Sequence, residues 1–600
     1  MIPTMKILEN VKRNSTKNRD EVFTRLYRYM LRPDLYYVAY QNLYANNGAS
    51  TQGVNKDTAD GFGEEKIQTI IQSLADESYK PNPARRTYIK KANGKMRPLG
   101  IPTFTDKLVQ EVLRMILEAV YEPVFFNCSH GFRPNRSCHT ALKSLKKEFT
   151  GIRWFVEGDI KGCFDNIDHK TLVEVINRKI KDARLIKLIY KLLKAGYMED
   201  WTYHKTYSGT PQGGIVSPLF ANIYLHELDK FVDSLAKKFD QPAKQKYTDE
   251  YTAIHNEINH IKYRLSKAQD EEKEQLLSEL HQARKRLLST PAKSQTDKKL
   301  KYIRYADDFI IGVNGSKNDC VMIKQGLAEF ISNQLKMEMS EEKTLITHSS
   351  ERARFLGYDI QVRHSGKIKP NKKVGYTSRT LNGTVDLSIP LDDKIMRFLF
   401  EHEIIRQKNG EIKSTHRKHL LHCTDLEIVM AYNAEIRGIC NYYSLASNFY
   451  KLHYFSYLME YSCLKTLSAK HHSKVTKIRE HYKDGLGGWA IPYETKKGKK
   501  MCHIVKHTDC KKAADDVDRI EDTTTKFRLS RNTFERRLAV KQCELCGATN
   551  AKQYEVHHIH KVKDLKGKEP WEKMMIAKRR KTMVVCKNCH AQIHSCKVST

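Results

Sequence analysis

The chain has 600 residues, and its 105 Lys and Arg outnumber its 70 Asp and Glu to give a formal net charge of +35. This length allows about three or four domains that each bury a core, and a charge this large attracts polyanions. Because no long apolar span is present, composition excludes a membrane-spanning chain and favours nucleic acid as the polyanion, although a basic protein with solvated charged faces would have a similar count.

The N-terminal part is expected to be helical and basic. Residues 20–45 carry apolar and aromatic side chains at helical spacing, interleaved with arginines such as Arg25 and Arg28. The pattern fits an ordinary amphipathic helix, and it equally fits an RNA-binding surface, because guanidinium and aromatic planes stack on bases. A loop over 46–50 and a further helix over 64–74 are predicted to follow.

Residues 84–104 are predicted to form a β-hairpin, because Asn93-Gly94 is a favoured two-residue turn. Basic residues flank this turn, including Lys90 and Arg97. A basic hairpin opposite an acidic cluster would hold a triphosphate. A solvated hairpin would also be rich in Lys, so both interpretations stay open.

Two further segments precede the most acidic motif. Residues 155–159 form an apolar strand that ends at Asp159, and a helix-like segment follows. Residues 205–229 begin as a Gly/Pro loop and are predicted to become a helix after Pro218. Within this loop, Gln212-Gly213-Gly214 would let the backbone approach a ligand closely.

Residues 241–300 are predicted to be a helical insertion, and a helical hairpin is one form of it. Apolar residues recur there at steps of three and four, in a background of Glu, Lys and Gln. A solvated pair of helices is the simplest interpretation, and contact with RNA is the alternative.

Residues 303–311 predict strand, tight turn and strand, with Asp307 and Asp308 at the turn. Two acids in a turn can simply satisfy their own backbone. Crowded carboxylates, however, repel one another unless a cation lies between them, which favours Mg²⁺. With Asp159 at the end of a second strand, three carboxylates could hold two Mg²⁺ ions about 3.5–4 Å apart, an arrangement that activates a 3′-hydroxyl and stabilises a pyrophosphate leaving group.

The C-terminal half contains helices, a basic region and a metal motif. Residues 385–470 are predicted to be helical, and the basic residues over 484–542 are typical of a solvated linker. Cys543-x-x-Cys546 and Cys586-x-x-Cys589 have the spacing of a tetrahedral Zn²⁺ site. His557-His558 stand between the two pairs, and His590 and His594 follow four residues apart. A purely structural zinc knuckle is the alternative for this segment.

The remaining cysteines, of 14 in all, are scattered, which indicates reduced thiols in an intracellular protein. The first residues lack the apolar stretch of a secretory signal, and acids such as Glu9 argue against a transit peptide. A cytoplasmic protein is therefore expected.

The order of these motifs resembles a reverse transcriptase. The basic hairpin, Asp159 with Phe164, residues 210–213, Tyr305-Ala306-Asp307-Asp308, and then residues 342–344 and 355–358 follow one another as in that family. The whole chain resembles the multifunctional proteins encoded within bacterial group II introns. This resemblance implies an α+β multidomain fold with right-hand fingers and palm, an α-helical thumb with maturase activity, a DNA-binding region and an HNH endonuclease with a ββα-metal core.

The implied domains are an N-terminal RNA-binding extension, fingers and palm, thumb and maturase domain, DNA-binding region and endonuclease, over residues 1–80, 81–365, 366–483, 484–542 and 543–600. The resemblance carries specific roles to the polymerase residues. Asp159, Asp307 and Asp308 match the Mg²⁺-binding triad, and Phe164 matches the steric gate against a nucleotide 2′-hydroxyl. Gln212 would contact the incoming nucleotide. Lys90 and Arg97 would hold its triphosphate, with Lys91 and Arg86 as the alternatives.

The resemblance to HNH endonucleases implies that His557 binds Mg²⁺ and that His558 is the general base. His590 and His594 would complete the metal or phosphate site. The Asn that names the motif is replaced, by spacing, by Lys581. The orienting role of that Asn is therefore unassigned.

The implied function is RNA-directed DNA synthesis, intron splicing and DNA nicking by one protein. It would bind its intron RNA as a ribonucleoprotein and use dNTPs and a double-stranded DNA target, where it would associate with the nucleoid. An RNA-templated RNA polymerase and a non-enzymatic RNA-folding cofactor are the alternatives. The oligomeric state is open, and a homodimer is one assembly compatible with the sequence.

Overall fold

A computed structural model describes residues 4–90, 94, 96–200, 202–206, 208–209, 213–241, 247–290, 292, 297–364, 368–371, 376–379, 382–485, 487–495, 498–510 and 533–595. Its mixture of helices and mostly antiparallel strands, divided among several packed units, confirms the expected α+β multidomain class. None of the helices within these ranges has both the length and the apolar character required to cross a bilayer.

The N-terminal part contains several short helices instead of one long one. They are α1 (Thr4–Lys17), α2 (Tyr27–Met30), α3 (Pro33–Tyr44) and α4 (Glu64–Ala75). The expected single helix over 20–45 is wrong, because Pro33 lacks an N–H and begins α3 at its first turn. The expected loop over 46–50 is a short 3₁₀ turn, whereas the helix predicted over 64–74 is confirmed.

The fingers contain the predicted hairpin. Strands β2 (Ala84–Lys90) and β3 (Met96–Ile101) pair antiparallel, in a sheet of order β3-β2-β5-β6 that also contains β5 (Tyr197–Glu199) and β6 (Thr202–His204). Asn93 at the turn lies outside the described residues. The long helix α5 (Phe104–Tyr121) follows the hairpin and is almost wholly buried, with Thr103 as its N-cap.

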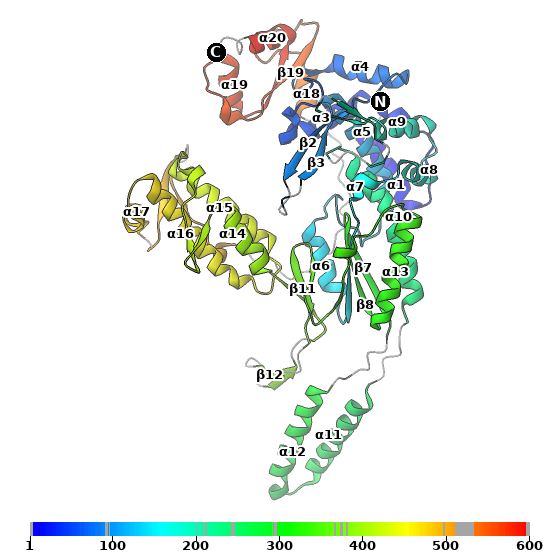
Figure 1. The fold of residues 1–600 in the computed structure, drawn as a ribbon, viewed down its shortest axis with the longest axis vertical. Coiled ribbons are helices and arrows are strands. Elements are labelled where there is room, and N and C mark those ends of the chain that lie inside the picture. Colours follow the sequence, from blue (N-terminus) through cyan, green and yellow to red (C-terminus); the bar gives the residue numbers. More distant parts are fainter. Residues whose placement is uncertain are drawn as a thin grey trace.

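The palm is a four-stranded sheet of order β7-β8-β4-β9. Its strands are β7 (Lys299–Tyr305), β8 (Asp308–Asn314), β4 (Trp154–Asp159) and β9 (Ile346–His348). Alternate strand residues enter two cores: Val156 and Ile311 pack with α10 (Ser217–Phe239), whereas Phe155 and Ile310 pack with α6 (Cys138–Glu148). The sheet therefore lies between helical layers (Figure 1).

Further helices complete the palm and extend from it. They are α7 (Cys163–Asn166), α8 (His169–Lys179), α9 (Ala183–Leu193) and α13 (Lys317–Asn333). The insertion forms α11 (Asp249–Lys267) and α12 (Asp270–Ser289), which pack through a small apolar core that includes Ile258, Ile261 and Leu280. Figure 1 shows this helical hairpin extending away from the body.

The region after the palm mixes strands and helices, so the prediction that 385–470 is helical is only partly correct. Its helices are α14 (Arg397–Glu401), α15 (Asp425–Tyr442), α16 (Leu452–Lys470) and α17 (Val475–His481). Its strands are β10 (Ala353–Phe355), β11 (Tyr358–Val362), β12 (Ile368–Asn371), β13 (Tyr376–Arg379), β14 (Val385–Ser388), β15 (Ile405–Lys408), β16 (Glu411–Ser414), β17 (Ala490–Thr495) and β18 (Gly498–His503). Trp489 and Ile491 bury apolar surface in the core that contains α15 and α16, so the hairpin β17–β18 packs with the thumb and not with a separate linker.

The C-terminal domain has its own core and also pairs with the N-terminal region. Its elements are α18 (Thr533–Ala539), β19 (Tyr554–His558), α19 (Pro570–Lys578), β20 (Thr582–Cys586) and α20 (Lys587–Ser595). The short strand β1 (Phe62–Gly63) extends the sheet β19–β20, with Phe62 opposite Val556. Residues almost five hundred positions apart therefore share one sheet (Figure 1).

Candidate functional site

The palm sheet brings three carboxylates to one end. Asp159 is the last residue of β4 and lies opposite Asp308, the first residue of β8. Tyr305 also pairs with Asp308, so Ala306 and Asp307 form the two-residue turn between β7 and β8. The strand register therefore places the predicted metal-binding triad at one end of the sheet.

The turn is held in place by a buried arginine. Arg304 is fully buried, and its Nη1 donates to the carbonyl of Ala306 at 2.9 Å. Its Nε and Nη2 donate to the two carboxylate oxygens of Asp229, both at 2.7 Å. Ala306 has a left-handed φ of 57°. A Cβ at position 131 would lie 2.3 Å from the Ala306 nitrogen, so glycine is required at position 131.

The electrostatics of the triad call for a cation. Although Asp308 keeps an exposed edge, partial removal from water, together with Asp307 and Asp159, raises its pKa to about 7. Burial and the charge of Asp159 also raise the pKa of Asp307. Lys343 Nζ donates to Asp159 Oδ2 at 2.6 Å and supplies one compensating charge. A divalent cation bound by these oxygens would supply more, so the residues fit a hard metal ion.

Phe164 lies just after the left-handed Gly162, in the one-turn helix α7 that follows Asp159. Its half-buried ring packs edge to face against Phe132, with ring centroids 5.9 Å apart. The ring is thereby fixed close in sequence and space to the triad. This is a position from which an aromatic side chain can restrict what binds beside the carboxylates.

The fingers residues differ in their relation to the triad. Arg97 lies opposite Ile89 in the hairpin, so Lys90 projects from the other face. The charge of Arg97 lowers the pKa of Asp307 against the stronger effect of burial, which places Arg97 within electrostatic reach of the triad. Gln212 lies outside the described residues.

The glycine after Gln212 has a structural use that differs from the expected approach to a ligand. Gly213 has a φ of 116°, and a Cβ there would lie 2.5 Å from the carbonyl oxygen of Gly100 in β3. The close approach that glycine permits is therefore to the backbone of the fingers.

The four motif cysteines meet in the C-terminal domain. One Sγ from each of Cys543, Cys546, Cys586 and Cys589 lies within 4.8 Å of the others, a spacing that suits four ligands of one ion. Although burial opposes it, hydrogen bonds from backbone N–H groups lower the pKa of Cys543 to about 7. Its thiolate form, which binds metal, is thereby favoured.

A second group of possible metal ligands lies beside β19. His557, His590 and His594 come together as the sequence predicts, but a fourth member, Asp60, comes from the N-terminal region. His590 Nδ1 bonds to Glu555 Oε2 at 2.7 Å, which turns its Nε2 toward the group. Although burial opposes it, hydrogen bonds to Asp60 and Glu555 raise the pKa of His590 to about 9.

His558 lies next to this group and faces the N-terminal region. Its Nε2 is 3.0 Å from the carbonyl oxygen of Tyr44. Burial lowers the pKa of His558, which favours the neutral imidazole that a general base requires. Lys581, at the expected Asn position, accepts a hydrogen bond from the Ile559 N–H through its backbone carbonyl.

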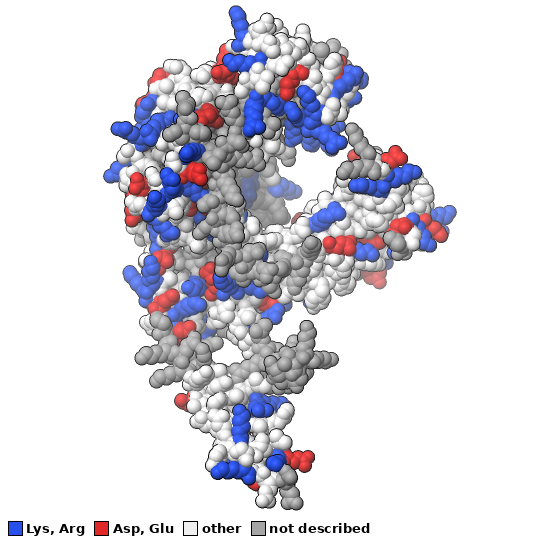
Figure 2. Space-filling model, turned by 180° about the vertical axis from the view of Figure 1, so that it is seen from behind, with Lys and Arg blue, Asp and Glu red and all other residues white. Residues whose placement is uncertain are grey.

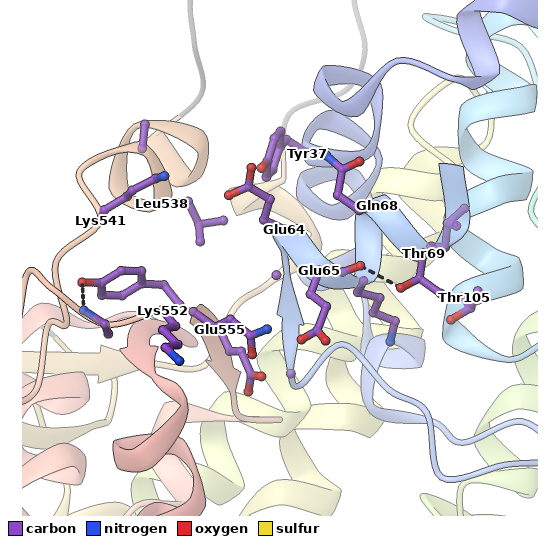
Figure 3. Close-up of a pocket in the computed structure, with 18 residues that line it drawn as sticks. Tyr37, Glu64, Glu65, Gln68, Thr69, Thr105, Leu538, Lys541, Lys552 and Glu555 are labelled. Carbon is purple, nitrogen blue, oxygen red and sulfur yellow. Dashed lines mark hydrogen bonds between the residues drawn. The ribbon is translucent and has the colours of Figure 1, made fainter. Parts of the chain in front are cut away.

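A cavity of about 920 Å³ lies near the histidine group, between the N-terminal and C-terminal regions. Figure 3 shows Glu64, Glu65 and Gln68 on one side of it and Leu538, Lys541 and Lys552 on the other. Gly61 and Glu555 also line it, so it borders the histidine group. Charges of both signs line the cavity, and the triad of Asp159, Asp307 and Asp308 is not part of its lining.

Three family models match successive parts of the chain. Residues 89–360 match "Reverse transcriptase (RNA-dependent DNA polymerase)" and residues 382–529 match "Type II intron maturase". Residues 543–590 match "AI2M/AI1M-like, HNH endonuclease". The maturase match spans the expected boundary at 483, which agrees with the packing of β17–β18 on the thumb.

Full-length relatives resemble the whole chain. Group II intron-encoded protein LtrA of Lactococcus lactis subsp. cremoris is 61% identical over 596 residues, which is 99% of either chain. An uncharacterized 91 kDa protein in the cob intron of Schizosaccharomyces pombe is 35% identical over 99% of this chain and 72% of its own. Among solved structures, apo telomerase from Candida tropicalis, truncated from its C-terminal domain, has 14% identity, covers 52% of this chain and 61% of that chain, and has a TM-score of 0.28, which is too low to bear on the fold.

Proposed function

The chain belongs to the family of group II intron-encoded proteins, and on that premise we propose which residues carry out its reverse transcriptase, maturase and HNH endonuclease functions. The observation that carries the polymerase assignment is the register of β4 and β8, which sets Asp159 opposite Asp308 beside the turn residue Asp307. These three carboxylates are proposed to hold Mg²⁺.

The chemistry that Mg²⁺ supplies at such a triad is activation of the primer 3′-hydroxyl and stabilisation of the pyrophosphate leaving group. The protein's own residues position the substrates. Phe164 excludes a 2′-hydroxyl and so selects dNTPs, and Gln212 contacts the incoming nucleotide. Arg97, whose charge reaches Asp307, holds the triphosphate, and Lys90, which projects from the other face of the hairpin, adds positive charge beside it.

The thumb and its surroundings are proposed to bind intron RNA and DNA. Tyr454, Tyr457 and Tyr461 form an exposed row on α16, suited to stacking on unpaired bases. Figure 2 shows a hollow between the thumb and the upper part of the molecule, with Lys and Arg gathered along its upper border. This charge would attract a nucleic acid backbone.

The C-terminal domain is proposed to nick the second DNA strand. His558 would deprotonate the attacking water, and His557, His590 and His594 would bind a divalent cation that stabilises the leaving oxygen. The four cysteines would hold a structural Zn²⁺. Imidazole ligands suit transition metals better than Mg²⁺, so the ion at the histidines could differ from the one at the polymerase triad.

The domains over residues 1–80, 81–365, 366–483, 484–542 and 543–600 remain part of the proposal, with β17–β18 packed on the thumb. The partners are an intron RNA, with which the protein forms a ribonucleoprotein, a double-stranded DNA target and dNTPs. A homodimer is one assembly to be tested. The proposed location is the cytoplasm, at nucleoid DNA targets.

Primer extension on an RNA template tests the polymerase assignment. Asp159→Asn should abolish Mg²⁺-dependent incorporation of dNTPs, because one of three carboxylates is lost. Asp233→Asn is the matched control, since Asp233 is a half-exposed carboxylate on α10 that pairs only with Lys237 among the ion pairs described. Equal primer-extension activity of the two variants would mean that Asp159 is not a metal ligand. A preference for ribonucleotides over dNTPs would favour an RNA polymerase.

A further inference from the structure

The N-terminal region reaches the endonuclease centre through a strand pairing. The Gly61 N–H donates to the Val556 carbonyl at 3.0 Å, and Phe62 pairs with Val556. This pairing fixes the position of Asp60 immediately before β1. The backbone is held on both sides of Asp60. Before it, the Tyr40 hydroxyl donates to the Ala59 carbonyl at 2.9 Å, and after it, β1 pairs with β19.

The Asp60 carboxylate lies at the distances expected of ligands that share one ion. Its Oδ1 is 3.2 Å from His557 Nδ1 and 3.3 Å from His590 Nε2, and its Oδ2 is 2.7 Å from His594 Nε2. The two nitrogens of His590 and His594 are 3.3 Å apart. Four ligands at about 2.1 Å from a tetrahedral ion are separated by about 3.4 Å. One ligand atom from each of the four residues lies within 4.8 Å of the others, so the group is compact enough to share one cation.

His557 gives independent evidence that a ligand belongs there. Its side chain is only 1% exposed; Nδ1 lies 3.2 Å from Asp60 Oδ1 outside hydrogen-bond geometry, and within the described part of the chain Nε2 has no hydrogen-bond partner. A buried imidazole nitrogen that makes no hydrogen bond is costly unless something binds it. We propose, on the basis of the endonuclease function assigned above, that Asp60 is the fourth protein ligand of the endonuclease cation.

The N-terminal region also orients His558, the proposed general base. Donation from His558 Nε2 to the Tyr44 carbonyl fixes the tautomer in which Nδ1 is unprotonated and can accept a proton from water. The His558 backbone N–H also donates to Asp60 Oδ1 at 2.6 Å. The Tyr44 carbonyl thus supplies the orientation that the Asn replaced by Lys581 would have given.

DNA would reach this centre from the side of His594. The His594 side chain is 46% exposed, whereas those of His557 and His590 are 1% and 10% exposed. Because Asp60 comes from the N-terminal region and the three histidines from the C-terminal domain, the four ligands meet only while the two parts are docked. A scissile phosphate would enter over His594 and Asp60 as a fifth ligand, because a four-coordinate cation of this kind can expand to five ligands.

Co²⁺ titration of the full-length protein tests the role of Asp60. The cysteine site is first filled with Zn²⁺. Co²⁺ bound by imidazoles at low coordination number then gives strong visible absorption bands, whereas Co²⁺ bound by the carboxylate triad does not. Asp60→Asn keeps the size of the side chain and an oxygen for the His558 N–H. We expect Co²⁺ binding at least about tenfold weaker than in the parent protein.

Two controls separate the possible failures. Glu65→Gln removes an exposed carboxylate from the first turn of α4 and should leave Co²⁺ binding unchanged. His590→Ala should abolish the imidazole bands. If His590→Ala had no effect, the proposed endonuclease site itself would be wrong, whereas loss in His590→Ala with none in Asp60→Asn would overturn only the role of Asp60.

Nicking of DNA provides a second readout. If Asp60 binds the cation, Asp60→Asn should lower nicking together with Co²⁺ affinity. If the carboxylate instead blocks the histidines, the substitution should tighten Co²⁺ binding and raise nicking, and this outcome would refute the proposal. Retained primer extension by the variant shows that the protein is folded.

Discussion

The buried pair of Arg304 and Asp229 supports the turn that carries Asp307, and its removal should be costly. Arg304→Met keeps much of the side-chain volume but leaves the Asp229 carboxylate without a counter-charge, and both side chains are fully buried. Breaking such a pair typically costs about 3–5 kcal/mol. The substitution also removes the donors to Ala306 and Ser129, so the turn that carries Asp307 loses its support.

Hydrogen exchange measured on peptides from β7 and β8 gives the loss in the free energy of local unfolding. This measurement avoids treating a multidomain chain as one unfolding unit. Arg178→Met is the matched control. Arg178 is 65% exposed and pairs with Glu227, so its loss should cost only about 0–1 kcal/mol. Primer extension should fall in Arg304→Met and be unaffected in Arg178→Met.

The double variant decides whether the charge is the cause. Adding Asp229→Asn to Arg304→Met removes the unpaired charge, so the combined loss should be smaller than the sum of the two single losses. If Arg304→Met cost less than about 1 kcal/mol, or if the two losses simply added, the proposed role of the buried pair would be refuted.

Three further predictions concern pH, nicking and nucleotide choice. Because the folded-state pKa of Asp308 is raised to about 7, its destabilising effect appears as pH rises from the ordinary carboxyl range through 7, so the metal-free protein should gain stability when pH falls from 8 to 5. Thermal unfolding should show a larger gain in the parent than in Asp308→Asn, and an equal pH dependence in both would contradict the assignment. His558→Ala should abolish second-strand nicking but leave polymerisation on an annealed primer intact, and a nicking assay that still detected cleavage would remove His558 as the base. Phe164→Ala should open space for a 2′-hydroxyl and lower the preference for dNTPs over rNTPs in competitive primer extension, whereas an unchanged preference would mean that another group is the steric gate.

The meeting of Asp159, Asp307 and Asp308 could be predicted because its signals are local. Asp159 ends β4 and Asp307 comes two residues after β7, and an acid at the end of a strand can be recognised from a few residues. The hairpin around Asn93-Gly94 and the helical insertion are local patterns of the same kind. Each is confirmed where the structure describes it.

The structure adds residues whose roles depend on distant pairings. Asp60 joins the histidines only because β1 pairs with β19, and no pattern near residue 60 indicates a partner near residue 556. Asp229 meets Arg304 because α10 packs on the palm sheet, although a charged residue inside an apolar strand at 304 was a signal that could have been followed. The strands within 385–470 were missed because short apolar runs do not distinguish strand from helix.

The most direct test of the account compares the parent protein with Asp308→Ala in two assays on the same preparation. One assay measures dNTP incorporation on an RNA template with a DNA primer and Mg²⁺, and the other measures binding and splicing of a group II intron RNA. If Asp308 binds the Mg²⁺ that activates the primer, the variant should lose DNA synthesis and retain RNA binding and splicing. Incorporation by Asp308→Ala at the parental rate, or none by a folded parent protein, would contradict the account.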